Sequence, residues 1–389
     1  MARHTLRSWW RKIWLPLSDS HGPHKPDYIL LIVSGVVILF GLVMLSSATA
    51  YFAYNNKDYG DTYYFLKQQI TRGLIPGLIL YFIFIRLPYQ KLKKLGWWWL
   101  IISIVLLSCV LIPGLGREIH NSRSWLGVGS IAIQTSEIAK LTFIIFLAFW
   151  LERQQRVIAD MKATFWPFLV FLGIVATLLF LQPDIGTLLI FVAIAATMYF
   201  AAGMTVGQMI TLLVLSLGGL GLAVRLAPYR LQRLVTFLNP NYDTQGAGYQ
   251  LKQALIAIGS GGLWGLGLGQ SRQKFNYLPE VAADSIFAVI AEEWGWISSV
   301  LLIILFITIC IRGLRIAKYA PDTFAKLLTI GIIGWITIQA AVNIAAIIGL
   351  MPLTGLPLPF ISLGGSNLAV VMMALAIVTN ISKYTLERS

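Results

Sequence analysis

The stretch YLPEVAADSIFAVIAEEWGW, residues 277–296, places acidic side chains at the head of an apolar segment. It contains Glu280, Asp284, Glu292 and Glu293, which are a quarter of the 16 acidic residues in the chain. A carboxylate buried in a membrane costs several kcal/mol and usually marks a functional or tightly paired site. We therefore expect this segment to combine a membrane helix with at least one functional carboxylate.

The composition of the whole chain indicates a membrane protein. Hydrophobic residues make up 57% of the 389 residues and charged residues 12%, which is too apolar for a soluble domain. A membrane-crossing helix needs about 20 mostly apolar residues. The sequence predicts an all-α polytopic integral membrane protein with about ten transmembrane helices and a large extracytoplasmic loop, about 227–283, between spans 7 and 8. The ten predicted spans are 28–52, 69–86, 96–113, 137–151, 167–182, 187–203, 208–226, 284–311, 326–348 and 366–382.

The distribution of Lys and Arg predicts the orientation, because these residues are enriched in cytoplasmic loops. The N-terminal tail, residues 1–27, is basic and is predicted to be cytoplasmic. Ten spans then return the short C-terminal tail, 384–389, to the same side. The transmembrane domain is predicted to run over 28–383.

Twelve of the 30 basic residues nevertheless fall outside or near the outer face. Long exterior loops escape the positive-inside bias, and this accounts for about half of them. The other interpretation is an outward-facing basic cavity for a phosphate or pyrophosphate group, as found on a lipid carrier. The candidate ligands of that group are Arg123, Lys140, Arg230, Arg233, Arg272 and Lys274.

Several further motifs have structural explanations. Residues 248–258 show helical periodicity typical of an interfacial amphipathic helix. The glycines of 259–269 lack a preceding strand and a GK[ST] signature, so they indicate close backbone packing or a re-entrant turn instead of a nucleotide loop. Gln339 and Asn343, at i and i+4, are predicted to form interhelical hydrogen bonds.

Two further acidic positions have structural explanations, and for the first of them the sequence leaves an alternative open. Glu137 and Lys140, at i and i+3, form a mutual ion pair or mark a substrate pathway. Pro183 and Asp184, in LQPDIGT, break one helix and cap the next.

The stretch LMPLTGLPLPFISLGGSN, residues 350–367, predicts a rigid shaped wall, and it carries a family resemblance. With SRSW, QTSEIAK, QPDIGT, PYRLQRLVTFLNP, GYQLKQALIAIGSGGLWGLGLG and YLPEVAADSIFAVIAEEWG in order, it resembles the SEDS family (FtsW, RodA, SpoVE), and is most similar to FtsW. The motif positions of the stretch are Pro352, Gly355, Pro357, Pro359, Ser362, Gly364, Gly365 and Ser366. The chain departs from the family pattern at Thr135, Ala282, Ala283, Ser285, Leu363 and Asn367.

The resemblance implies a peptidoglycan glycosyltransferase that polymerises lipid II on the outer face of the bacterial cytoplasmic membrane, in division or elongation. It assigns the catalytic role to Asp284. It also implies a class B penicillin-binding transpeptidase and other divisome or elongasome membrane proteins as partners, and no nucleic acid.

The predicted chemistry uses Asp284 as a general base on a sugar hydroxyl, while cations stabilise the departing pyrophosphate. A divalent cation, Mg or Mn, could share the second duty, although the sequence shows no metal-ligand motif. Glu292 and Glu293 lie about 12–14 Å further along the helix, so they are assigned to structure or pairing. Asp284 could instead be a helix cap. The rival functions are a lipid II flippase and a non-catalytic scaffold that activates a transpeptidase.

Overall fold

The computed structural model describes residues 24–55, 60–119, 122–128, 131–225, 228–239, 246–275 and 277–386. The predicted N-terminal tail lies outside these ranges except for its last four residues, and the predicted C-terminal tail is described only to residue 386. The described chain ends meet, since the His24 amide donates to the Lys383 carbonyl at 2.9 Å.

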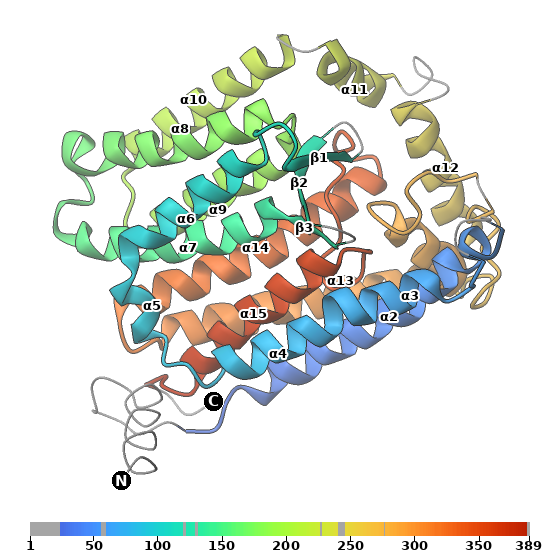
Figure 1. The fold of residues 1–389 in the computed structure, drawn as a ribbon, viewed down its shortest axis with the longest axis horizontal. Helices are drawn as coiled ribbons and strands as arrows, with labels where there is room; N and C mark the ends of the chain where they lie inside the picture. The colour runs from blue at the N-terminus through green and yellow to red at the C-terminus, as the bar shows by residue number, and fades with distance from the viewer. Residues whose placement is uncertain are drawn as a thin grey trace.

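The described chain is a bundle of helices that run side by side (Figure 1). Each of the ten predicted spans lies largely on helical residues of the described chain, so the predicted all-α polytopic fold is confirmed. The helices are α2 (Tyr28–Asn55), α3 (Tyr64–Gln69), η1 (Ile70–Leu74), α4 (Ile75–Phe84), α5 (Gln90–Lys94), α6 (Gly96–Cys109), α7 (Thr135–Arg153), η2 (Gln155–Val157), η3 (Met161–Phe165), α8 (Trp166–Leu181), α9 (Ile185–Ala202), α10 (Val206–Arg225), α11 (Pro228–Leu238), α12 (Ala247–Ser260), α13 (Ile286–Lys318), α14 (Thr323–Ile347) and α15 (Gly365–Ser382).

Six stretches of the described chain are long and apolar enough to cross a membrane, and the count of ten stays a prediction. They are Tyr28–Asn55, Met161–Leu181, Ile185–Ala202, Ile286–Lys318, Thr323–Ile347 and Gly365–Ser382. Gly96–Cys109 and Val206–Leu222 are shorter apolar helices. A helix satisfies its own backbone hydrogen bonds, which a bilayer cannot do for it.

A small antiparallel sheet, which the sequence did not predict, lies between α6 and α7. Its strands are β1 (Gly116–Ile119), β2 (Ser122–Val128) and β3 (Ile131–Gln134), paired in the order β1-β2-β3. The sheet, α11 and α12 lie at one end of the bundle, opposite the end where residues 24–27 and 383–386 meet (Figure 1). We call this end, together with residues 350–364, the sheet end.

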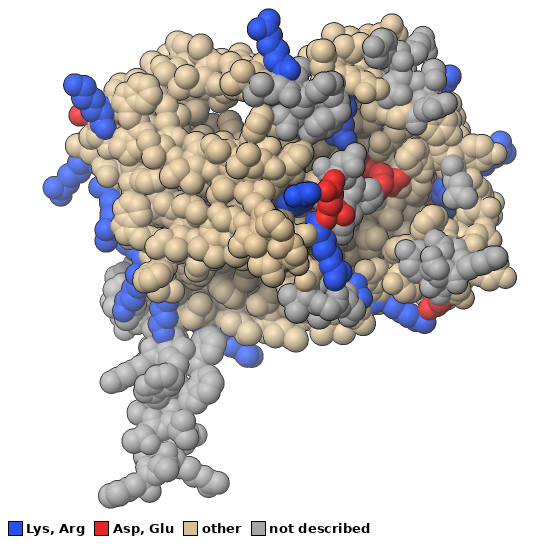
Figure 2. Space-filling view, turned by 45° about the horizontal axis from the view of Figure 1, so that its top comes forward, with Lys and Arg blue, Asp and Glu red and all other residues tan. Residues whose placement is uncertain are grey.

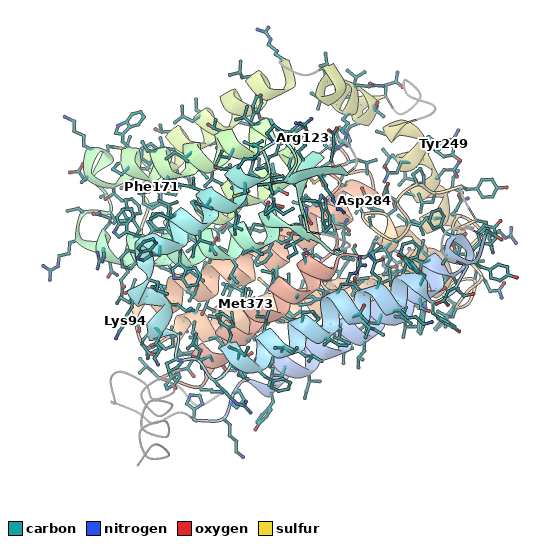
Figure 3. All side chains as sticks on the ribbon, viewed as in Figure 1. Lys94, Arg123, Phe171, Tyr249, Asp284 and Met373 are labelled. Atoms are coloured by element: carbon teal, nitrogen blue, oxygen red, sulfur yellow. The ribbon has the colours of Figure 1, made fainter. Side chains whose placement is uncertain are left out.

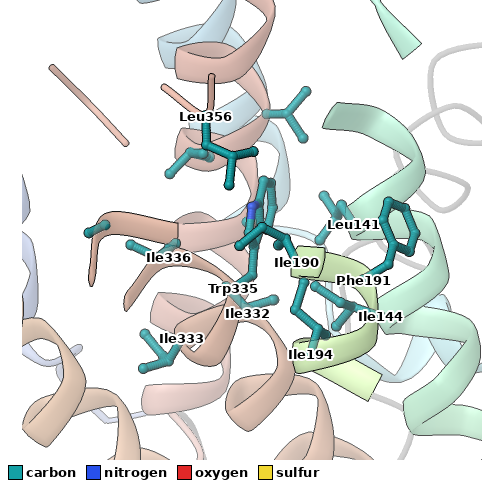
Figure 4. Packing of buried hydrophobic residues seen from close by; sticks show 14 of the residues in the cluster. Leu141, Ile144, Ile190, Phe191, Ile194, Ile332, Ile333, Trp335, Ile336 and Leu356 are labelled. Atoms are coloured by element: carbon teal, nitrogen blue, oxygen red, sulfur yellow. The ribbon is translucent and has the colours of Figure 1, made fainter. Parts of the chain in front are cut away.

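The core of the bundle is built around α7, which is buried along almost its whole length. Figure 4 shows its side chains Leu141 and Ile144 packed with residues of α9 and α14, among them Ile190 and Trp335. Outer helices such as α10 instead leave many of their apolar side chains exposed. Such a surface is stable against lipid tails, and it agrees with a membrane environment.

The helix α13 is interrupted at Gly295, whose φ of 76° and ψ of −175° are not helical. The glycine-rich segment after α12 packs directly on this break. Leu266 and Gly267 donate their amides to the carbonyls of Glu292 and Glu293, both at 2.9 Å. The predicted close backbone packing is confirmed, because a Cβ at Gly261 would lie 2.0 Å from the Ala291 carbonyl oxygen.

Residues 350–364, which we call the wall loop, connect α14 to α15 without regular secondary structure. The side chains of α14 hold its backbone: the Gln339 amide donates to the Pro357 carbonyl at 2.9 Å. The Gln69 side chain donates to the Ser362 carbonyl at 3.2 Å and accepts from the Gly364 amide at 3.0 Å. These bonds agree with the prediction of a rigid, shaped segment.

The junction of the wall loop with α15 gives a test of this packing. A Cβ at Gly365 would lie 2.7 Å from the Arg72 carbonyl oxygen, and backbone cannot move aside cheaply. We expect Gly365→Val to lower stability by at least the roughly 1–3 kcal/mol typical of overpacking. Thermal unfolding of the purified protein in detergent and its level in membranes measure this.

The neighbouring glycine is a matched control. A Cβ at Gly364 meets only the Asn367 Cβ at 3.4 Å, and its φ of 168° is extended backbone. Gly364→Ala is therefore expected to unfold close to the parent temperature. Equal melting temperatures for Gly365→Val and Gly364→Ala would contradict the packing described here.

Candidate active site

Asp284 lies in the turn that leads into α13 at the sheet end. Its side chain is only 8% exposed. In the view of Figure 3 it lies between β2, which carries Arg123, and α12, which carries Tyr249. The cap position of α13 is Ser285, whose side chain makes no capping hydrogen bond. Asp284 is thus not the helix cap, and this structural explanation of the residue fails.

The carboxylate of Asp284 is held by two polar side chains. Gln250 of α12 donates to Oδ1 at 3.2 Å, and the Ser285 hydroxyl lies 3.5 Å from the same oxygen. Burial, followed by the negative charge of Glu280, raises the pKa of Asp284 to about 6, against the lowering effects of Gln250 and Arg233. The group is therefore ionised at neutral pH and close to a proton-transfer range.

The backbone of this turn is fixed by α14 and the wall loop. The Asn343 amide donates to the Asp284 carbonyl at 2.9 Å and to the Leu356 carbonyl at 2.7 Å. The Leu363 amide donates to the Ala282 carbonyl at 2.8 Å, and the Ser362 hydroxyl donates to the Ala283 carbonyl. The predicted interhelical hydrogen bonding is confirmed for Gln339, which accepts from Lys140 of α7 at 2.8 Å, and is wrong for Asn343, whose amide donates to carbonyls outside the helices.

Other positions of the stretch 350–367 pack against neighbouring elements. The Ser366 hydroxyl accepts from the Gln134 amide at 3.2 Å, which ties α15 to the end of β3. Gly355 adopts a left-handed φ of 70°, and Phe360 is buried and stacked on Phe306. The shape of the wall therefore reaches from the sheet to α13.

Arg233 is the cation that the structure relates most directly to Asp284. It extends from α11, is exposed, and donates to the Leu353 carbonyl at 3.3 Å. The positive charge of Arg233 lowers the pKa of Asp284. Arg230 lies one turn earlier on α11, and its side chain is outside the described residues.

Two further predicted cations are exposed. Arg123, on β2, forms a surface pair with Glu118 at 3.3 Å. The side chain of Arg272 is exposed, while its backbone amide donates to Glu292 at 2.9 Å. In Figure 2, basic and acidic side chains gather beside a hollow on this face of the molecule.

The remaining two predicted ligands, Lys140 and Lys274, are occupied by internal partners. Lys140 is completely buried and donates to Glu137 and Gln339, each at 2.8 Å. Lys274 is 5% exposed and donates to Glu293 at 2.8 Å. Each ammonium group thus neutralises a buried carboxylate, and its role as a substrate ligand stays a prediction.

Glu292 and Glu293 have the structural role that their depth predicts. Glu292 accepts from the Ser271 hydroxyl and the Arg272 amide, and Glu293 accepts from the Ser47 hydroxyl and Lys274. Both are 1% exposed. Together they fix the segment after α12 onto α13 and α2.

Comparison with known proteins identifies the family. The FtsW/RodA/SpoVE family model, described as "Cell cycle protein", matches residues 27–387. Stage V sporulation protein E of Bacillus subtilis is 40% identical over 361 residues, which cover 93% of this chain and 98% of that protein. The probable peptidoglycan glycosyltransferase FtsW of Trichlorobacter lovleyi is 38% identical, covering 92% and 93% of the two chains. The chain belongs to the FtsW/RodA/SpoVE family.

Solved structures of this family share the fold. A chain described under "Structural coordination of polymerization and crosslinking by a peptidoglycan synthase complex" is 28% identical, with a TM-score of 0.74, over 92% of this chain and 98% of that one. RodA of Thermus thermophilus is 26% identical, with a TM-score of 0.68, over 93% and 98%. The protein is thus a multi-pass membrane protein of the FtsW/RodA/SpoVE fold, as the resemblance implied.

Sequence reasoning missed two members of the site, Gln250 and Ser285. Gln250 lies on the polar side of the predicted amphipathic helix, where a solvated glutamine is unremarkable. A signal was available in Ser285, because a hydroxyl directly after the candidate base departs from the FtsW/RodA/SpoVE family pattern.

The Lys274–Glu293 pair gives a prediction that separates pairing from substrate binding. Removing one partner of a buried ion pair leaves an uncompensated charge, so Lys274→Met is expected to cost about 3–5 kcal/mol of stability. Adding Glu293→Gln to that variant is expected to recover most of the loss. Thermal unfolding in detergent measures both.

The exposed neighbour Arg272 is the control for this pair, and Arg272→Met is expected to change stability by less than about 0.5 kcal/mol. If Lys274→Met unfolded like Arg272→Met, the buried pair would not have the role assigned to it.

Proposed function

We propose that this protein is a peptidoglycan glycosyltransferase that polymerises lipid II into glycan strands at the sheet end of the bundle. The observation that carries the proposal is the buried carboxylate of Asp284 at the sheet end, which accepts from Gln250 and lies beside the wall loop that Arg233 contacts through the Leu353 carbonyl. It is supported by relatives named as probable peptidoglycan glycosyltransferases that match over almost their whole length.

The reaction joins the sugar 4-hydroxyl of one lipid II to the anomeric carbon of the growing strand. The carboxylate of Asp284 takes the hydroxyl proton as the new oxygen–carbon bond forms and the bond to the polyprenyl pyrophosphate breaks. A base with a pKa of about 6 is ionised at neutral pH and still accepts a proton readily. The electron pair of the broken bond leaves on the pyrophosphate.

Arginines stabilise that leaving group. Arg233 is the first candidate, and Arg230, Arg123 and Arg272 are the other cations that the proposal retains at the sheet end. A guanidinium binds phosphate oxygens through two parallel hydrogen bonds, which suits a dianionic product. Lys140 and Lys274 are left out because their charges are already paired.

The proposal includes the divalent cation, Mg or Mn, only as an aid to pyrophosphate binding. In the part of the chain that the structure describes, no three His, Cys, Asp or Glu side chains gather into a ligand set. Oxygen ligands from the pyrophosphate would have to supply most of its coordination.

A flippase would need polar groups along a route through the bundle. Of the buried ion pairs in the described chain, Glu137–Lys140 lies in the first turns of α7, and Lys274–Glu293 lies beside the segment after α12. Asp27–Arg312 joins the first described residues to the second half of α13. The charges thus lie toward the two ends of the bundle, an arrangement that favours polymerase over transporter.

The proposal places the sheet end outside the cytoplasmic membrane of a bacterium and both termini inside. A class B penicillin-binding transpeptidase is the proposed partner, with other divisome or elongasome membrane proteins around it. The similar chain from a peptidoglycan synthase complex supports this assignment.

Replacing the base gives the central test. Asn keeps the shape of Asp but cannot take a proton at neutral pH, so Asp284→Asn is expected to lower glycan synthesis from purified lipid II by at least about 10²-fold. Synthesis by the parent should also fall as the pH drops through about 6, because the carboxylate then becomes protonated. Glycan strands are quantified by gel electrophoresis of labelled product.

Glu280→Gln is the matched control on the same turn. The Glu280 charge raises the pKa of Asp284, so its removal is expected to retain synthesis and to move the acid limb to lower pH. Near-parent synthesis by Asp284→Asn would reject the base. Loss of lipid II transport in vesicles with unchanged polymerisation would favour the flippase.

The pyrophosphate site is tested by binding. Arg233→Ala removes a charge-assisted contact, which is worth roughly 1.5–3 kcal/mol, so the Kd for lipid II is expected to rise roughly 10- to 100-fold. Arg156→Ala, an exposed cation in η2, is the control and should leave the Kd unchanged. Unaltered binding by folded Arg233→Ala would place the leaving group elsewhere.

A further inference from the structure

Gln250 is placed beside Asp284 by the packing of α12 on the first turns of α13. The apolar side chains Leu251, Ala254 and Ala257 of α12 are buried. Gln250 itself is half-buried, and its amide reaches Asp284 and Ser285 across a sequence separation of more than 30 residues. A glutamine on an outer amphipathic helix thus becomes part of the site only through this docking.

The hydrogen bonds at this point have a defined direction. The Gln250 amide carries two N–H groups, and Nε2 lies 3.2 Å from Asp284 Oδ1 and 2.9 Å from the Ser285 hydroxyl oxygen. The Ser285 hydroxyl, which is completely buried, can donate in turn to the same Oδ1 at 3.5 Å. Among the described residues, every side-chain donor to this carboxylate therefore acts on Oδ1, and Oδ2 is left to take a proton.

We propose that Gln250 is a positioning residue for the reaction: its amide, anchored on Ser285, fixes the Asp284 carboxylate through Oδ1 and directs Oδ2 to the acceptor hydroxyl. This inference rests on the proposed glycosyltransferase function. Gln250 acts through Asp284 and needs no contact with the substrate.

The same contacts set the pH range in which the base works. A hydrogen bond to the ionised carboxylate favours it, so Gln250 lowers the pKa of Asp284. The charged groups that face the carboxylate are Glu280, from its own turn, which raises the pKa, and Arg233, from α11, which lowers it. Loss of the Gln250 amide leaves burial and Glu280 with less opposition, and the acid limb of activity moves to higher pH.

Gln250→Leu tests the inference, because Leu has a similar volume and no donor. We expect kcat at the pH optimum to fall about tenfold, with KM for lipid II unchanged and the acid limb of the pH profile shifted upward. Gln253→Leu, the same change one turn further along α12, is the matched control and should keep kcat and the pH profile of the parent. A purely structural loss would lower the active fraction without moving the acid limb.

A second variant covers the case in which Gln250→Leu does not fold. Ser285→Ala removes the anchor of the amide together with the weak 3.5 Å contact of the hydroxyl to Oδ1, and it is expected to shift the acid limb in the same direction by a smaller amount. The kcat of the double variant should be no lower than that of Gln250→Leu, because both changes break the same set of hydrogen bonds among Gln250, Ser285 and Asp284. Parent-like kcat and pH profile in folded Gln250→Leu, or in Ser285→Ala when Gln250→Leu is unfolded, would overturn the proposal.

The two hypotheses fail in different ways. If the parent protein makes no glycan from lipid II, the proposed function is wrong. If the parent polymerises, Asp284→Asn does not, and Gln250→Leu equals Gln253→Leu, only the positioning role is wrong.

Discussion

The amide of Asn343 donates to two carbonyls from different parts of the chain, Asp284 before α13 and Leu356 in the wall loop. A buried carbonyl without a partner is costly, so one side chain of α14 satisfies both and holds them together. The Ser362 hydroxyl and the Leu363 amide join the wall loop to the same turn through Ala283 and Ala282. The position of the candidate base is thus set by a loop about 70–80 residues away along the chain. A proline-rich segment suits this task, because fixed φ angles leave little freedom to lose.

Among the described residues, the buried carboxylates of Glu137 and Glu293 have a bonded cation, whereas those of Glu292 and Asp284 do not. Glu292 is surrounded by two backbone amides and two hydroxyls instead. Glu137 is bound by Lys140 and Asn367, and Glu293 by Lys274 and Ser47. Asp284, in the part of the chain that the structure describes, has no cation within ion-pair distance and relies on neutral donors. Direct pairing would hold a carboxylate ionised and unreactive, whereas a neutral amide leaves the proton affinity high. The sparse neutral contacts of Asp284 therefore agree with its proposed role as a base.

Hydropathy predicted the bundle because a helix is the simplest way to satisfy the backbone in lipid, and all ten predicted spans are largely helical. The pairing of Glu137 with Lys140 could be predicted from the sequence, since residues i and i+3 share a helix face. The sheet of Gly116–Gln134 could not be predicted, because its strands are only four to seven residues long and lie between two apolar helices. The pairing of Lys274 with Glu293 was not predicted either, because the two residues meet only through the packing of the segment after α12 on α13. Gln250 was missed because helix periodicity shows which face of α12 is polar and gives no information on what that face meets.

The helix α12 connects the deep carboxylates with the candidate base, Asp284. Gly261 follows α12 directly and packs on the Ala291 carbonyl, and the Ser260 hydroxyl reaches Glu292 at 3.4 Å. The C-terminal end of α12 is thereby fixed beside residues 291–292, while Gln250 near its other end meets residues 284–285. From Gln250 to Ser260 the helix rises about 15 Å, and α13 rises about 11 Å between the two contact points, so the helices run alongside each other in the same direction. A shift of the contact at residues 291–292 would be transmitted along the rigid helix α12 to the contact of Gln250 with residues 284–285. Glu292 and Glu293 fix the segment that follows α12, and through α12 they help to fix the Gln250 amide beside Asp284. Acidic residues of one stretch thus contribute to the position of one carboxylate.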